Sequence, residues 1–131
     1  MPRRATTKAG GFDAEHLREL FSAFAPVTVR RMFGGAGIYA EQTIFAIAVD
    51  GVIYLKADER TIPAFEREGL KPFSYGVKNK RVVMSYWRMP ERLYDDAEEL
   101  AQWSREALGA AQRVASGGAP RGTAKGKKRK R

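Results

Sequence analysis

The side chains that most often perform chemistry are few in this sequence. His16 is the only histidine and there is no cysteine, so a zinc site lacks a set of ligands. No serine stands in the G-x-S-x-G pattern of a hydrolase nucleophile. The paired carboxylates at 58–59, 95–96 and 98–99 lie where helices are expected to begin, and there the helix macrodipole favours negative charge. We therefore expect no catalytic residue, no metal and no cofactor.

A glycine-rich segment matches the letters of the dinucleotide-binding fingerprint. Residues 35–40 read Gly-Ala-Gly-Ile-Tyr-Ala, which fits G-x-G-x-x-G/A. The mechanism of that motif needs a helix N-terminus directly after the glycines. Because β-prone residues follow here, we expect a β-bulge or a tight turn around Gly34, Gly35 and Gly37 in place of a nucleotide site.

Aromatic and basic side chains of the expected strands form a second group of candidates. Adjacent strand residues point to opposite faces, so Tyr86 and Trp87 cannot enter the same core layer. Strand aromatics can stack on bases, as in an RNA-recognition motif, but the RNP1 pattern is absent and strands buried on one face need aromatics anyway. The candidate surface for a protein partner or a small ligand comprises Arg31, Gly34, Gly35, Gly37, Tyr39, Tyr54, Lys56, Tyr86 and Trp87.

Positive charge is concentrated at the two ends of the chain. The net charge is +9, yet residues 12–112 carry 13 basic residues against all 15 acids. Residues 1–11 carry three basic residues and residues 113–131 carry eight, with no acid in either segment. The folded part as a whole is therefore not a basic nucleic-acid-binding domain, and only the ends should attract polyanions strongly.

The C-terminal segment is expected to be disordered and to bind nucleic acid without reading its sequence. Residues 116–131 lack the apolar surface needed to offset the entropy of ordering. Flexible cations bind phosphates by releasing counterions, and charge alone does not distinguish bases. A terminus that only solubilises the chain is the open alternative. The candidate nucleic-acid-binding residues are Arg121, Lys125, Lys127, Lys128, Arg129, Lys130 and Arg131.

The helices and strands expected to carry these residues follow from apolar spacing and from turn residues. The strongest local signal is Asp50-Gly51 between two apolar, β-branched runs, because Asp-Gly suits a type I′ hairpin turn. Hairpin-length links imply a mostly antiparallel sheet of five to six strands with helices on one face, a two-layer α+β fold. The expected elements are a helix at 14–24, strands at 27–32, 38–40, 43–49 and 52–57, a helix from 58 or 61 to 69, strands at 73–75 and 81–88 separated by a polar loop at 76–80, and a helix from Asp95 or Asp96.

This organisation predicts one domain at 12–115, preceded by a flexible basic arm at 1–11 and followed by the basic tail at 116–131. The absence of cysteine favours a reducing compartment, and the N-terminus has no apolar stretch typical of a secretory signal. No run approaches the ~18 apolar residues of a membrane span. We expect a cytoplasmic protein with no membrane partner, and the sequence leaves its oligomeric state open.

Four short motifs follow one another along the chain: 31–39 (RMFGGAGIY), 50–58 (DGVIYLKAD), 73–76 (FSYG) and 84–90 (MSYWRMP), with Trp103 in the last helix. In this order they resemble the N-terminal domain of the TfoX/Sxy family of bacterial competence regulators, over about residues 16–112. The resemblance implies a two-layer α+β fold with an antiparallel sheet and a regulatory role, and it supplies no established catalytic residues.

Full-length regulators of that family promote transcription of DNA-uptake genes together with the cyclic-AMP receptor protein. They carry a second, helical domain, whereas in this sequence we expect residues after 112 to form a basic tail.

Three functions remain as hypotheses. The first is a non-enzymatic regulatory or adaptor protein, whose domain contacts a protein partner such as a transcription factor while the tail adds non-specific affinity for nucleic acid. The second is a small-ligand-binding module or an unrecognised enzyme that uses the turn at 34–37 with Arg31, Tyr39, Tyr54 and Lys56. The third is a protein–protein interaction domain with a merely solubilising tail.

Overall fold

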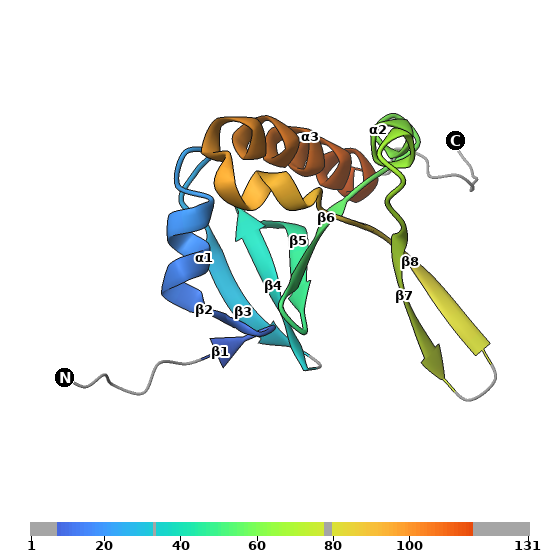
Figure 1. Ribbon diagram of the computed structural model, residues 1–131, viewed down its shortest axis with the longest axis horizontal. Helices are drawn as coiled ribbons and strands as arrows, with labels where there is room; N and C mark the ends of the chain where they lie inside the picture. Colours follow the sequence, from blue (N-terminus) through green and yellow to red (C-terminus); the bar gives the residue numbers. More distant parts are fainter. Residues whose placement is uncertain (1–7, 33, 78–79, 117–131) are drawn as a thin grey trace.

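One helical layer covers a six-stranded antiparallel sheet in this protein, as predicted (Figure 1). The computed structural model describes residues 8–32, 34–77 and 80–116. The sheet has the strand order β3-β4-β5-β6-β8-β7. The elements in chain order are β1 (Lys8–Ala9), β2 (Phe12–Asp13), α1 (Ala14–Leu20), β3 (Thr28–Met32), β4 (Gly35–Ala40), β5 (Thr43–Val49), β6 (Val52–Lys56), α2 (Ile62–Arg67), β7 (Pro72–Val77), β8 (Lys80–Arg88), the 3₁₀ helix η1 (Glu91–Asp95) and α3 (Ala97–Ala115).

The predicted hairpin at Asp50-Gly51 is confirmed. Val49 of β5 pairs with Val52 of β6, and the two residues between them have φ angles of 53° and 78°. Positive φ at both central positions is the requirement of a type I′ turn, whose twist matches that of the flanking strands. This turn sets the register of the two central strands.

The glycine-rich segment is mostly strand, which corrects the expected turn at 34–37. Only Gly34, with a φ of 77°, lies before β4, whereas Gly35 and Gly37 pair within it. An irregularity does occur, but further along, where Ile38 pairs with Ala46 and Tyr39 with Ile44. Phe45 is the extra residue of this bulge, and it is fully buried.

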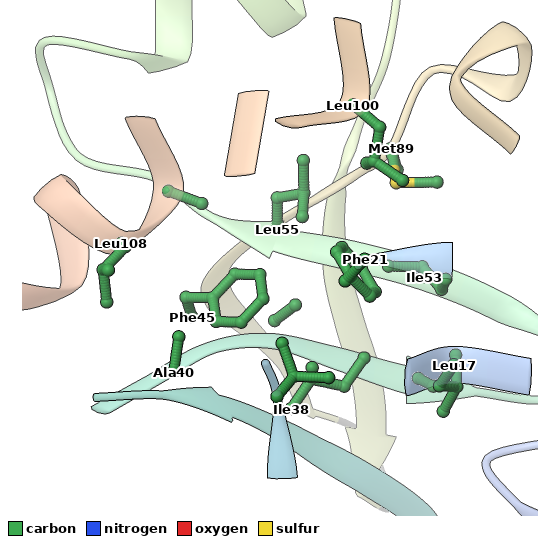
Figure 2. Close-up of a cluster of buried hydrophobic side chains, with 14 of the residues drawn as sticks. Leu17, Phe21, Ile38, Ala40, Phe45, Ile53, Leu55, Met89, Leu100 and Leu108 are labelled. Atoms are coloured by element: carbon green, nitrogen blue, oxygen red, sulfur yellow. The ribbon is translucent and has the colours of Figure 1, made fainter. Parts of the chain in front are cut away.

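The core lies between the sheet and the helices. Cross-strand neighbours share one face of a sheet, and the pairs from β3 to β8 align Val29, Ile38, Ala46, Leu55 and Trp87 in one row. Figure 2 shows side chains of this row with others of the cluster around it. Helix α1 contributes Leu17 to the cluster, and α3 contributes Leu100 and Leu108.

Acidic residues cap the two longer helices, α1 and α3. The Asp13 carboxylate accepts a hydrogen bond from the Glu15 backbone N–H at 3.0 Å, and α1 then ends at Leu20 rather than near residue 24. Asp96 accepts from the Glu99 backbone N–H at 3.0 Å and is the cap of α3. Its neighbour at 95 belongs to η1, an element that the sequence pattern does not predict.

Two expected loops are shorter than predicted. The arm expected at residues 1–11 contains β1, which forms a hairpin with β2. This hairpin packs on the β5–β6 turn, where the Gly51 N–H donates a hydrogen bond to the Gly10 carbonyl at 2.8 Å. The polar loop expected at 76–80 shrinks because β7 extends to Val77 and β8 begins at Lys80. The β7–β8 hairpin thus projects well beyond the helical layer (Figure 1).

Candidate functional site: the open face of the sheet

The face of the sheet opposite the helices gathers several of the predicted candidates. One residue along from the core row, the same strand pairs align Arg30, Gly37, Ile47, Tyr54 and Arg88. Because alternate residues of a strand share a face, the following row adds Tyr39 and the pair formed by Lys56 and Tyr86. We call this surface the open face; its residues are Arg30, Met32, Tyr39, Ile47, Tyr54, Lys56, Phe73, Tyr86 and Arg88.

Cations and aromatic rings of the open face contact one another. The guanidinium carbon of Arg30 lies 5.5 Å from the centroid of the Tyr39 ring, and the Lys56 Nζ lies 4.9 Å from that of Tyr86. Both distances are within the range of a cation–π interaction. The rings of Tyr54 and Phe73 meet edge to face at 4.9 Å. Each ring therefore has a defined neighbour across the strands.

Burial changes the proton affinity of two groups on this face. Tyr86 is only 8% exposed, and desolvation, with a smaller contribution from the nearby Tyr39, raises the pKa of its hydroxyl to about 12. Desolvation also lowers the pKa of the Lys56 ammonium, which donates a hydrogen bond to Ser85 Oγ at 2.7 Å. Both shifts favour the neutral form of the group, because burial penalises charge.

The positive charge of the open face is not neutralised within the described part of the chain. Arg30, Lys56 and Arg88 form no ion pair there, whereas Arg92 of η1 and Arg113 of α3 each bind carboxylates. The six strands of the sheet contain no aspartate or glutamate at all. An anion that approaches this face therefore meets no acidic side chain on the strands.

Four of the predicted candidates that carry side chains lie together on the open face: Tyr39, Tyr54, Lys56 and Tyr86. Trp87 lies on the opposite face, with its ring 5.9 Å from that of Phe65 in α2, so the predicted separation of Tyr86 and Trp87 is confirmed. Arg31 aligns with Ala36, a core residue, and so belongs to the helical side of β3.

The glycines of β4 serve packing rather than a cavity. A side-chain carbon at Gly37 would approach Ile44 Cδ1 at 2.8 Å and Met32 Sδ at 3.0 Å, and one at Gly35 would approach the Ala48 carbonyl oxygen at 2.6 Å. The space above both glycines is thus filled by the protein itself. This arrangement gives no support to a ligand site at the glycines.

Five members of the open face were not among the predicted candidates: Arg30, Met32, Ile47, Phe73 and Arg88. Arg30 and Arg88 were not selected because the strand partners that align them with Tyr54 are set by register, which the sequence leaves open. The alternation of residues along each strand could have indicated this, because Arg30 and Met32 alternate with core positions as Tyr54 and Lys56 do.

A cavity of about 390 Å³ lies elsewhere, between α2 and α3, lined by residues that include Arg60, Trp103 and Arg105. Of the predicted candidates only Lys56 touches it; Lys56 is the last residue of β6 and so lies where the open face meets the helical layer. Within residues 8–32, 34–77 and 80–116, no three His, Cys, Asp or Glu side chains gather closely enough to hold a metal ion. No helix of the same ranges combines the length and hydropathy that crossing a membrane requires.

The seven cations of the predicted tail lie outside the described residues, which end at Ser116, the C-cap of α3. The fold and the open face together define a small two-layer α+β domain with an antiparallel sheet whose helix-free side is aromatic and basic. Residues 19–111 match the family model described as the TfoX N-terminal domain. The chain belongs to the TfoX N-terminal domain family, as its sequence motifs suggested.

Two relatives illustrate the match. The chain is 26% identical over 94 residues to Protein Sxy of Escherichia coli (strain K12), which covers 72% of this chain and 45% of that protein. It is 26% identical over 100 residues to DNA transformation protein TfoX1 of Aliivibrio fischeri (strain ATCC 700601 / ES114), which covers 73% of this chain and 48% of the relative. The chain thus spans about half the length of these relatives.

Proposed function

We propose that this chain is a non-enzymatic regulatory or adaptor protein of the bacterial cytoplasm, acting in the control of DNA uptake. Membership of the TfoX N-terminal domain family is the observation that carries the proposal, because one relative is named a DNA transformation protein. The folded domain would contact a protein partner such as a transcription factor. The tail would keep the complex near nucleic acid.

The tail is suited to a contact that does not read sequence. Its last seven residues include six cations, and the whole segment 113–131 has no acid. Neutralising about five phosphates of duplex DNA gives a log–log salt slope of about −4 to −5. Such a contact raises the local concentration of the domain near DNA without selecting a site.

The test is a titration of a fluorescent DNA duplex with two full-length proteins, the wild type and a variant with all seven tail cations changed to Gln. Between about 50 and 200 mM salt, the slope above predicts that wild-type affinity falls by roughly 10²–10³-fold. The Gln variant should lose this salt-sensitive binding at the lower salt concentration.

The matched control for this titration changes only Lys125, Lys127, Lys128 and Lys130 to Arg, which keeps every charge and should keep the binding. Undiminished binding by the Gln variant would refute the role of the tail. If none of the three proteins binds the duplex, the tail is a solubilising segment and the domain is a protein–protein module.

A further inference from the structure

The layers of the domain differ in charge although the domain as a whole is close to neutral. The six strands of the sheet carry six basic residues and no acid, so all 15 acids of the chain lie outside this sheet. Of those basic residues, Arg30, Lys56 and Arg88 belong to the open face and lack carboxylate partners in the described ranges. The charge of the open face is therefore complementary to a polyanion.

The rings of the open face are arranged across several strands. Tyr39 lies on β4, Tyr54 on β6 and Phe73 on β7, and all three side chains are partly exposed. Neighbouring strands are about 4.8 Å apart, so the rows from β4 to β8 extend over about 14 Å, which is room for more than one base. Tyr86 is buried beneath Lys56 and supports this surface from within.

We propose that the open face binds single-stranded nucleic acid, with bases stacked on Tyr39, Tyr54 and Phe73 and phosphates held by Arg30, Lys56 and Arg88. Grooves that bind single strands combine basic side chains with aromatic platforms, because every base has a face that can stack. A duplex conceals the faces of its bases, so it can satisfy the cations but not the rings. An acidic peptide likewise offers negative charge to the cations but no base that can stack on the rings.

This inference goes beyond the proposed function, in which only the tail meets nucleic acid. The two are tested separately because the tail-neutralised, full-length protein described above removes the tail contribution. In that background, a fluorescein-labelled (dT)12 strand should bind in about 100 mM salt, and a 12-base-pair duplex should bind at least tenfold more weakly.

Single substitutions in the same background locate the contact. Loss of one stacked base corresponds to roughly 5–150-fold in affinity, so Tyr39→Leu and Tyr54→Leu should weaken (dT)12 binding by that factor. Tyr39→Phe keeps the ring and should bind like the parent protein, which separates stacking from any effect on folding.

Charge is tested with neighbours on one strand. Arg30→Gln should weaken (dT)12 binding and make its salt slope shallower by about one unit, whereas Arg31→Gln, on the helical side, should leave both nearly unchanged. The proposal is overturned if the tail-neutralised protein does not bind (dT)12. It is also overturned if Arg30→Gln and Arg31→Gln behave alike, or if poly-glutamate competes as well as (dT)12 does.

Discussion

At the scale of single residues, Asp58 connects two helices that are distant in the sequence. Its Oδ2 accepts a hydrogen bond from Arg113 Nε at 2.6 Å, and its Oδ1 accepts from Arg113 Nη2 at 3.1 Å. The same carboxylate accepts from the Arg60 backbone N–H at 3.1 Å, just before α2. One side chain thus orders the approach to α2 and holds the last turns of α3.

The electrostatics of this pair set a dependence on pH. The hydrogen bond from Arg113 is the largest of several effects that hold the pKa of Asp58 below its usual 3.8, against an opposing contribution from desolvation. Because the pKa of the folded state is depressed, the pair stabilises the protein fully above the pKa of the unfolded state, about 4. That stabilisation is lost as pH falls through the folded value.

Arg113→Gln should therefore lower the free energy of unfolding by about 1–2 kcal/mol at pH 7. This lies between the cost of losing an exposed ion pair and that of losing a hydrogen bond to a buried charge, since the Asp58 side chain is 10% exposed and that of Arg113 34%. Urea unfolding at pH 7 and pH 3 measures the difference, which should shrink at pH 3.

The control for this substitution is Arg105→Gln. Arg105 is exposed on the same helix and forms no ion pair within the described ranges, so the change should stay within about 0.5 kcal/mol at both pH values. A gap between wild type and Arg113→Gln that widens on acidification would contradict the linkage argument.

At the scale of elements, the β5–β6 hairpin depends on a backbone conformation that favours glycine. Gly51 has a φ of 78°, and a side-chain carbon there would have nothing within 4 Å, so any cost of Gly51→Ala comes from the backbone alone. That cost is about 1–2 kcal/mol for a residue in the left-handed region. Thermal or urea unfolding should show the loss.

Substitution of a second glycine by alanine should change stability in the opposite direction, and it serves as the control. Gly109 lies within α3, where an added side-chain carbon meets only the Arg113 Nη1 at 3.4 Å. Gly109→Ala should raise stability by about 0.5–1 kcal/mol, because alanine has the higher helix propensity. If the two substitutions change stability equally, local backbone conformation is not the cause of the stability changes.

An unpredicted element, η1, completes the hydrogen bonding of β6. The pairing of β6 with β8 covers only residues 54–56. At the preceding residue the Ile53 N–H donates to the Tyr94 hydroxyl at 3.0 Å, and the Ile53 carbonyl accepts from the Met89 N–H at 2.9 Å. A side chain from η1 thus replaces a strand partner where β8 has already ended.

At the scale of the whole molecule, one core joins the sheet to the helices. Leu55 occupies the central row and is fully buried. Leu55→Ala should lower the free energy of unfolding by about 2–5 kcal/mol, the sum of lost transfer energy and the cavity left behind.

Urea unfolding tests this through the midpoint, which should fall while the slope of the free energy with denaturant stays constant. Val114→Ala is the control, because Val114 is 38% exposed near the end of α3 and should change stability by no more than about 0.5 kcal/mol. A change confined to the slope would indicate that the core does not unfold as one unit.

Most of the elements and the fold class can be predicted from local sequence, although β1, β2 and η1 were not. Apolar spacing predicted α1 and α3, Asp50-Gly51 predicted the central hairpin, and strand parity predicted that Tyr86 and Trp87 would separate. These features are local, because each follows from residues a few positions apart and from the φ angles that they tolerate.

Which residues share the open face depends on strand register, which local sequence does not fix. Arg30 and Arg88 are 58 positions apart and align through four strand pairings, and a shift of one residue in any of them would move a side chain to the core. The near-neutral charge of residues 12–112 conceals a sheet without acids, because the helices that carry acids lie in the other layer. Burial of the apolar core sets the strand register and the layer to which each element belongs. The amino-acid composition therefore cannot show on which face the charge lies.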